Sequence, residues 1–203
     1  MRKITNSVIV LAIELLTSGF VQAQGTIYMS NLGQPSSGVA TVGNNSWAAV
    51  NFLTGNNAGG YSLNSVQLAM TGATGSPSGF TVMIYNEANN PAAILPGSSL
   101  DTLSGPSSLT LVPSTYYFIV LTSGTAISND AYELNEGASY ATSSDGGGGG
   151  LIFSSSDGSN WRGKPFTYAQ FGITATAVPE PSSAFLFLLG SGVLMYVRRI
   201  FHR

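Results

Sequence analysis

The chain has 203 residues, of which only 8 % are charged, and it contains no cysteine and a single histidine, His202. Residues 24–181 carry two basic and eight acidic residues, and this acidic balance excludes a nucleic-acid-binding role. The lack of cysteine, and of any histidine before the C-terminal tail, excludes thiol catalysis, zinc-thiolate sites and a Ser-His-Asp triad in that segment.

The N-terminus has the order of a secretory signal peptide. Arg2 and Lys3 supply positive charge, Val8 to Leu16 form an apolar core, and Val21-Gln22-Ala23 offers small residues for cleavage. We therefore expect residues 1–23 to be removed by cleavage after Ala23. An amphipathic N-terminal helix of the folded domain is the alternative.

The central segment, residues 24–177, alternates short β-prone runs with turn residues and has no helical stretch. We expect residues 26–46 to be a weakly patterned lead-in, and residues 72–79 and 86–105 to be mostly loop. The expected β-prone runs are Trp47 to Phe52, Tyr61 to Met70, Phe80 to Tyr85, Leu109 to Val112, Tyr116 to Leu121 and Tyr168 to Ala177. This spacing predicts an all-β domain, an antiparallel β-sandwich of jelly-roll kind.

One short repeat marks two turns. Ser143-Ser144-Asp145-Gly146 recurs as Ser155-Ser156-Asp157-Gly158, and Asp-Gly between β-prone flanks is a tight-turn signal. We expect a hairpin around Asp157-Gly158, with Leu151 to Ser155 as one arm and Asn160 to Trp161 as the other. The glycine run 146–150 is expected to be a flexible, exposed loop.

The central segment also resembles choice-of-anchor domains of the R type. The pieces that carry the likeness occur in the family's order: Asn45-Ser46-Trp47-Ala48, residues 60–66, Ser78-Gly79-Phe80-Thr81-Val82, residues 111–117, residues 156–161 and Phe171-Gly172-Ile173. The resemblance implies a β-rich surface module and brings no catalytic residues.

The C-terminus has three parts in a fixed order. Val178-Pro179-Glu180-Pro181 is followed by an uncharged stretch, residues 182–197, and the chain closes with Arg198, Arg199 and Arg203. We expect a transmembrane helix over residues 182–197, with the basic residues in the cytoplasm and the central segment outside. At about 1.5 Å per residue this helix is short for a hydrocarbon core of about 30 Å. A buried core helix is the alternative.

Residues 178–203 resemble the PEP-CTERM sorting domain of Gram-negative bacteria. Pro179, Glu180 and Pro181 match the family's motif, and Arg198 and Arg199 match its basic end. The resemblance implies recognition by an exosortase, a membrane cysteine protease that would cut near the motif. The product would pass from an inner-membrane intermediate to the cell surface or extracellular matrix, and Pro179-Glu180-Pro181 would be a substrate site.

The central segment offers three chemical alternatives. A pair of carboxylates among Asp130, Glu133, Glu136, Asp145 and Asp157 would suit a hydrolase, and the same acids would suit calcium, although their spacing fits no EF-hand. Solvated loop acids are the plainer interpretation. Trp161, beside Arg162 and Lys164, is expected to be exposed and is a candidate glycan contact, whereas Trp47 is expected in the core.

Three functional hypotheses follow. The first is a non-enzymatic surface or matrix protein without a cofactor, sorted by an exosortase and associated with exopolysaccharide or envelope. The second is a carbohydrate-binding module that uses exposed aromatic residues. The third is a carboxylate-dependent hydrolase.

Overall fold

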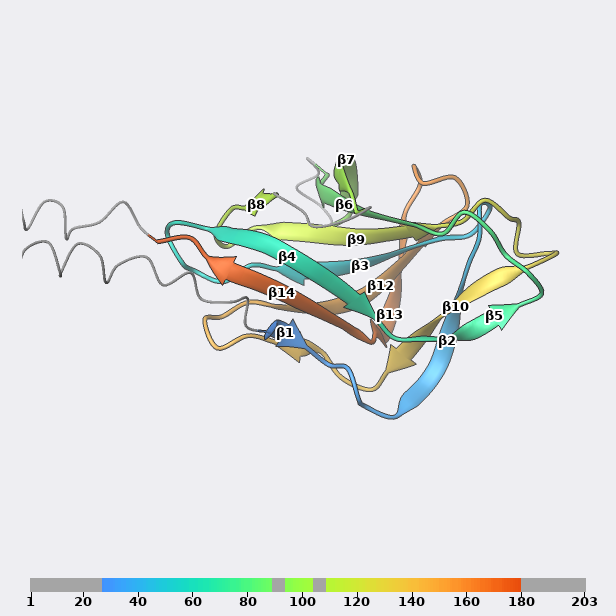
Figure 1. Ribbon diagram of the computed structural model, residues 1–203, viewed down its shortest axis with the longest axis horizontal. Helices are drawn as coiled ribbons and strands as arrows, with labels where there is room; N and C mark the ends of the chain where they lie inside the picture. The colour runs from blue at the N-terminus through green and yellow to red at the C-terminus, as the bar shows by residue number, and fades with distance from the viewer. Residues whose placement is uncertain (1–26, 89–93, 104–108, 180–203) are drawn as a thin grey trace, which may run out of the picture.

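The structure is a computed structural model that describes residues 27–88, 94–103 and 109–179 (Figure 1). This part of the chain is all-β, as expected, with antiparallel sheets and no helix. The signal peptide expected at residues 1–23 and the helix expected at 182–197 lie outside the described residues. Within the described residues, no helix is long and apolar enough to cross a membrane.

The described strands form two sheets. The smaller has the order β1-β14-β4-β8, with bounds β1 Ile27–Ser30, β14 Phe171–Ala177, β4 Tyr61–Leu68 and β8 Thr110–Leu111. The main path of the larger is β2 Ser36–Val42, β10 Ala131–Gly137, β13 Arg162–Ala169, β12 Gly148–Ser155, β3 Trp47–Leu53, β9 Tyr116–Thr122, β6 Thr81–Glu87 and β7 Pro96–Thr102. Two short strands lie off this path: β5 Met70–Thr74 pairs with β10, and β11 Ala141–Thr142 pairs with β12.

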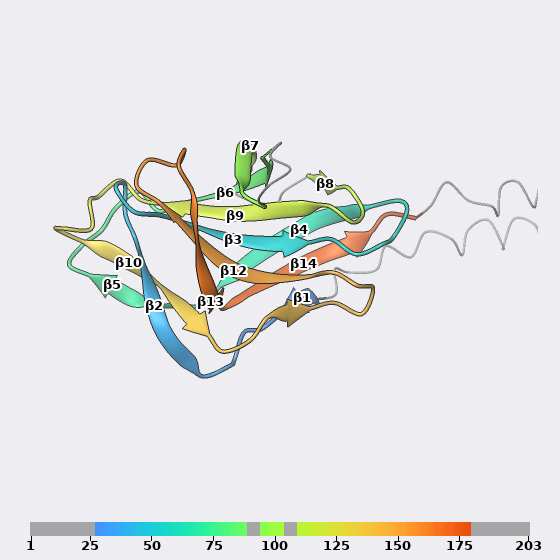
Figure 2. The same cartoon turned by 180° about the vertical axis from the view of Figure 1, so that it is seen from behind.

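The main hydrophobic core lies between the sheets. Leu63, Phe171 and Ile173 from the smaller sheet meet Phe52 and Ile119 from the larger one, and all five are completely buried. Figures 1 and 2 show the same layering from opposite sides, with β4 and β14 over the central strands of the larger sheet. Because each such side chain contributes about 1.5–3 kcal/mol on burial, this layer is the principal source of stability.

The central strands bury both of their faces. In β9, Ile119 belongs to the main core while Phe118 and Val120 join a second cluster with Phe153 and Trp161. Successive residues of a strand point to opposite faces, so the second cluster lies on the other side of the larger sheet. Strand β6, expected as a β-prone run from Phe80 to Tyr85, is partly buried on both faces: Val82 packs against the main core, and Met83 and Tyr85 pack against the second cluster.

Two strands pass from one sheet to the other at the same corner. β4 continues into β5 through Ala69, and β13 continues into β14 through Gln170. Backbone bonds close the corner: Ala69 N donates to Gln170 O (3.0 Å), Gln170 N to Asn135 O (2.9 Å) and Asn135 N to Ala69 O (2.9 Å). Asn31, the residue after β1, also stabilises the corner, because its side chain donates to Ala169 O and accepts from Phe171 N. The expected single strands over 61–70 and 168–177 are therefore each divided by a bend.

Only Gly146 of the glycine run is exposed, in the turn before β12, which corrects the expectation of an exposed loop for residues 147–150. Gly147 to Gly150 are buried, and residues 148–150 open strand β12. A Cβ on Gly149 would lie 2.3 Å from Asn51 O and 2.5 Å from Phe52 Cα. Gly149 is glycine because the neighbouring strand β3 passes too close for any side chain.

Three stretches expected to be irregular form strands. The lead-in at 26–46 contains β1 and β2, and the loop expected at 86–105 contains β7, which pairs with β6 at the edge of the larger sheet. Strand β5 occupies part of the loop expected at 72–79. The expected hairpin around Asp157-Gly158 is confirmed, with Ser154 opposite Arg162, and its first arm lies in β12. The second arm was misplaced: Asn160 and Trp161 lie in the connecting turn, and the pairing strand β13 begins at Arg162.

Candidate functional site

The chain leaves the sandwich at Val178 and Pro179, beside the start of β4. Val178 N donates to Gly60 O (2.9 Å), and Asn57 Nδ2 donates both to Val178 O (3.1 Å) and to Gly60 O (2.6 Å). Pro179 is exposed immediately beyond these bonds. The first residue of the expected sorting motif is thus presented at the surface by a fixed stretch of backbone.

The other predicted residues of the two ends lie outside the described residues. These are Ala23 at the expected cleavage point, Glu180 and Pro181 of the motif, and the basic residues Arg198, Arg199 and Arg203. Their predicted roles stay predictions.

A cluster of two tyrosines and one aspartate lies near this exit. Tyr61 donates from its hydroxyl to Asp145 Oδ2 and accepts from Asn57 N (2.9 Å). Ser143 Oγ donates to Asp145 Oδ1 (2.5 Å), and Tyr28 accepts a hydrogen bond from Gly55 N. The Tyr28 and Tyr61 rings lie 4.8 Å apart between centroids. The cluster therefore ties β1, the loop before β4 and the Ser143–Asp145 turn to one another.

The charge states of Tyr61 and Asp145 suit a structural role in holding these segments together. Burial raises the pKa of Tyr61, and the hydrogen bond to Asp145 raises it further. Burial by itself would raise the pKa of Asp145, but the hydrogen bonds from Ser143, Tyr61 and Tyr28 outweigh it and hold the pKa below its usual value. At neutral pH the tyrosine is protonated and the aspartate ionised, which is the arrangement of a strong O–H···O⁻ bond.

The second copy of the short repeat has the same geometry. Ser155 Oγ donates to Asp157 Oδ1 (2.9 Å), which also accepts from Ser159 N (2.8 Å) and Asn160 N (3.0 Å). These hydrogen bonds, led by the one from Asn160 N, hold the pKa of Asp157 well below its ordinary value. Gly146 and Gly158, which follow the two aspartates, have φ of +91° and +76°. The repeat thus builds two aspartate-bonded turns in which glycine takes the left-handed position.

The five acids considered for chemistry do not converge. Glu136 pairs with Lys164 (2.9 Å), Asp130 accepts from Ser76 N (2.7 Å), and Asp145 and Asp157 stabilise separate turns. Within the described ranges, no group of three His, Cys, Asp or Glu residues is placed to hold a metal ion. Glu133 and Glu136 both lie in strand β10, and neither they nor Asp145 is fully exposed, so the description as solvated loop acids is correct only in part.

Trp161 is not exposed, which corrects the expectation drawn from its basic neighbours. It is 8 % exposed and packs in the second cluster with Phe118 and Phe153. Arg162 and Lys164 are exposed because the first part of β13, residues 162–166, is exposed throughout, whereas Trp161 lies in the turn before this strand and packs inward. Trp47, expected in the core, is half-buried at the rim of this cluster, and the prominent exposed aromatic of the hairpin is Phe166, at 90 %.

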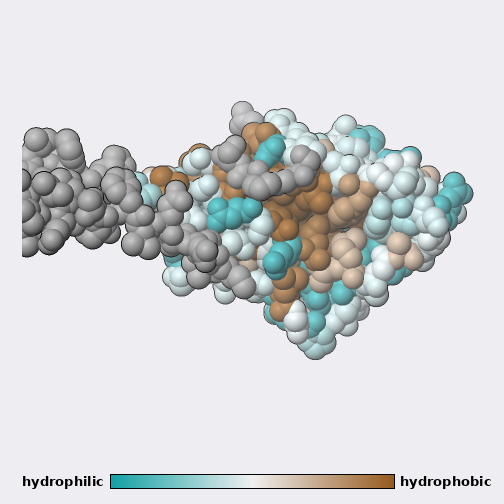
Figure 3. Space-filling model, viewed as in Figure 1, coloured by the Kyte–Doolittle hydropathy of each residue, from teal (hydrophilic) through white to brown (hydrophobic). Residues whose placement is uncertain are grey.

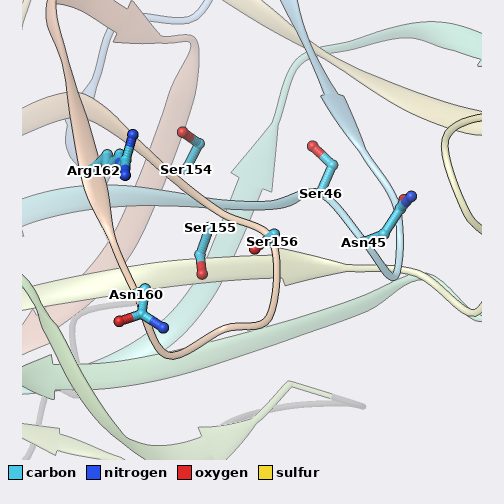
Figure 4. Close-up of a pocket in the computed structure, with 7 residues that line it drawn as sticks. All are labelled: Asn45, Ser46, Ser154, Ser155, Ser156, Asn160 and Arg162. Carbon is cyan, nitrogen blue, oxygen red and sulfur yellow. The ribbon is translucent and has the colours of Figure 1, made fainter.

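An open polar hollow of about 370 Å³ lies between the hairpin that joins β12 to β13 and the turn before β3 (Figure 4). No acidic side chain lines it. Its lining residues carry hydroxyl, amide or guanidinium groups: Asn45, Ser46, Ser154, Ser155, Ser156, Asn160 and Arg162. Sequence reasoning missed this hollow because Asn45 and Ser154 are far apart along the chain; the repeat at 155–158 located only the hairpin.

The two places differ in what they can do. The exit at Val178 and Pro179 presents a peptide segment, whereas the hollow presents side-chain donors. Among the described residues of the two places, no hydroxyl is placed beside a histidine or lysine that could act as its general base.

Comparison with known proteins supports the interpretation of the exit. The PEP-CTERM protein-sorting motif matches residues 177–200. Among curated proteins and among solved structures, no match to the chain was found. The chain therefore carries a PEP-CTERM sorting signal, which implies export, membrane-associated sorting to the cell surface and processing by an exosortase.

Proposed function

We propose that this chain is a non-enzymatic protein of the cell surface or extracellular matrix, cut by an exosortase next to Pro179-Glu180-Pro181. The observation that carries the proposal is the sorting motif at residues 177–200, which starts where the β-sandwich ends. Pro179 is exposed directly after the bonds that fix Val178, so a membrane protease can reach the motif without unfolding the sandwich.

In this proposal the two ends of the chain direct the protein out of the cytoplasm and to the cell surface. The signal peptide, residues 1–23, directs export and is removed after Ala23. The apolar helix at 182–197 then holds the protein in the inner membrane, and Arg198, Arg199 and Arg203 keep its end in the cytoplasm. Since this helix is short for a permanent span, we regard it as a transient anchor that cleavage removes.

A non-enzymatic role for the sandwich is supported by how its polar groups are used. Asp145 and Asp157 accept hydrogen bonds within turns, and Glu136 is paired with Lys164. The only histidine lies in the tail, and there is no cysteine. The ordered likeness to choice-of-anchor domains supports the same role, that of a surface module delivered to the envelope or to exopolysaccharide.

Intact mass and location in the native host test the proposal. We expect the surface or extracellular fraction to contain a protein that begins at Gln24 and lacks residues beyond the motif. A strain without the exosortase should retain the uncut form in the membrane. Replacing Pro179, Glu180 and Pro181 with alanine should have the same effect as deleting the protease.

A matched control replaces Ser98 and Ser99, exposed on edge strand β7, with alanine and should be sorted normally. The proposal fails if the triple-alanine protein has the mass and location of the wild type, or if the wild type stays in the cytoplasm.

A further inference from the structure

The polar hollow between the β12–β13 hairpin and the turn before β3 has an excess of hydrogen-bond donors. Arg162, Ser154 and Ser156 are exposed, and none of their side chains bonds to another described residue. Asn45 uses its Oδ1 to accept from Ile127 N (2.9 Å), so its amide N–H groups are left for solvent or a ligand. Guanidinium, amide and hydroxyl donors together fit an anionic group surrounded by further acceptors.

Arg162 gives the hollow its charge. Residues 24–181 contain only two basic side chains, Arg162 and Lys164. Lys164 is paired with Glu136, and its Nζ lies 2.9 Å from Oε1. Arg162 has no carboxylate partner among the described residues, so it is the cation of this region that is available to a ligand.

The nearest acid in the sequence does not compensate Arg162. Asp157 lies on the same hairpin, but its carboxylate accepts from Ser155 Oγ, Ser159 N and Asn160 N within its own turn. Those bonds hold its pKa well below the ordinary value, so it stays ionised and committed to the turn. The hollow is therefore a locally cationic spot on an acidic molecule.

The size of the hollow suits an occupant larger than a simple ion. Its volume of about 370 Å³ lies at the lower end of the range for small-molecule sites, to which one sugar ring with its substituents belongs. Figure 4 shows the side chains arranged around an open space, with Arg162 and Ser154 on one side and Asn45 and Ser46 on the other.

The position of the hollow also suits a ligand outside the cell. Figures 1 and 2 place the β12–β13 hairpin away from the end at which the chain leaves β14. A molecule held through its C-terminal segment would point this hairpin away from the membrane.

From these observations we infer that the hollow is a binding site for a saccharide that carries a carboxylate, that is, a uronic acid unit of a glycan. Arg162 takes the carboxylate through its guanidinium, and Asn45, Ser154 and Ser156 bond the ring oxygens and hydroxyls. The inference depends on the proposed surface location only for where such a glycan is met; the site itself depends on the donors alone.

The test uses the full chain in detergent micelles and oligogalacturonate as the probe, with half-saturation measured by calorimetry. We expect the wild type to bind and Arg162→Gln to bind at least tenfold more weakly. Lys164→Gln removes the same charge from the paired cation and should change half-saturation less than twofold. Asn45→Ala should weaken binding at least twofold, which reports on a second contact. Thermal unfolding of each variant checks that the fold is kept.

Two further ligands identify what is recognised. A neutral oligogalactoside, which keeps the hydroxyl groups but lacks the carboxylates, should bind at least tenfold more weakly than oligogalacturonate. Sodium sulfate at equal concentration should not displace the oligosaccharide. The inference is overturned if oligogalacturonate does not bind, if Arg162→Gln and Lys164→Gln behave alike, or if sulfate competes as well as the sugar. None of these outcomes bears on sorting, which is measured in the host.

Discussion

Asp145 shows how a single charged residue can stabilise the end of the molecule from which the sorting segment emerges. Its carboxylate accepts from Ser143 and Tyr61, and Tyr61 in turn accepts from Asn57, the residue that bonds Val178 O. The path from the carboxylate to the exit therefore runs through hydrogen bonds between three neighbouring segments. Removing the charge should loosen this end first.

The pH dependence of stability follows from the lowered pKa of Asp145. A carboxyl group whose pKa is lower in the folded than in the unfolded chain stabilises the fold above the unfolded value, about 3.9, and this contribution is lost as pH falls through the folded value. We expect Asp145→Asn to lower the free energy of unfolding by about 1–3 kcal/mol at pH 7. The difference from the wild type should shrink below about pH 4.

Urea unfolding of the two proteins at pH 7 and pH 3 measures this difference. Glu87→Gln, in β6 and outside the cluster, is the control for loss of a carboxylate elsewhere. An equal difference at both pH values would show that the ionised form of Asp145 is not what stabilises the turn.

At the scale of the element, strand β12 depends on a polar residue buried in its neighbour. The pairing of β12 with β3 shifts register between Gly149 and Ile152, and such a bulge leaves backbone N–H groups unpaired. Asn51, 3 % exposed in β3, accepts from Gly150 N (3.2 Å) and Leu151 N (2.9 Å) through its Oδ1. The side chain thus replaces the backbone acceptor that the bulge removes.

Replacing this acceptor should be costly. Asn51→Ala leaves two donors without a partner in the interior, and we expect it to lower the free energy of unfolding by about 2–4 kcal/mol. Asn86→Ala is the matched control, because Asn86 Oδ1 accepts from Ser98 N (2.7 Å) in an exposed hairpin where water can take over. That variant should lose about 1 kcal/mol or less. Equal losses in chemical denaturation would contradict a special role for the buried acceptor.

The strands that could be predicted from the sequence are those whose side chains are apolar and β-prone where the strand is buried. The run from Tyr116 to Leu121 is apolar and β-prone throughout, and β9 is buried on both faces. Strand β10 was missed because its buried residues, Ala131, Leu134 and Gly137, recur every third position and not every second. Because successive residues of a strand point to opposite faces, Ala131 and Leu134, three positions apart, are buried on opposite faces of β10, and period-two alternation is lost.

Of the two candidate sites, one could be predicted from the sequence and the other could not. The sorting motif is contiguous, so Pro179 and its neighbours could be read directly from the sequence. The hollow joins residues 45–46 to residues 154–162, and only the pairing of β3 with β12 brings them together. Glycine gives no side-chain signal, so the burial of Gly149 against β3 was equally invisible.

At the scale of the whole molecule, the chain enters the sandwich through β1 and leaves it through β14 at the same end of the smaller sheet. Ile27 lies opposite Thr174 in the antiparallel pair of β1 and β14, and β14 ends at Ala177 (Figure 1). Figure 3 shows that the same face of the molecule also exposes a hydrophobic area beside β4. Half-buried apolar side chains such as Val66 and Val82 pack against the main core, so part of the core's edge is exposed to solvent.

This arrangement sets limits on where the chain can be cut at each end. Met29, in β1, is 1 % exposed in the main core, and Tyr28 bonds Gly55 N and contacts the Tyr61 ring. Cleavage after Ala23 removes neither residue, whereas a cut after Ser30 removes both. Loss of a buried methionine side chain alone costs about 2–5 kcal/mol, a large part of the 5–15 kcal/mol that stabilises a typical domain.

We therefore expect a protein spanning residues 24–179 to unfold in urea as a stable domain, and one spanning 31–179 to be destabilised by at least about 2 kcal/mol. Both end at Pro179 and so keep the bonds from Asn57 to Val178, which means that only the N-terminal strand differs. Coincident unfolding curves would show that β1 contributes nothing to the core. The same experiment bears on processing, because a mature protein that retains β1 must be cleaved before Ile27, and the expected site after Ala23 satisfies this condition.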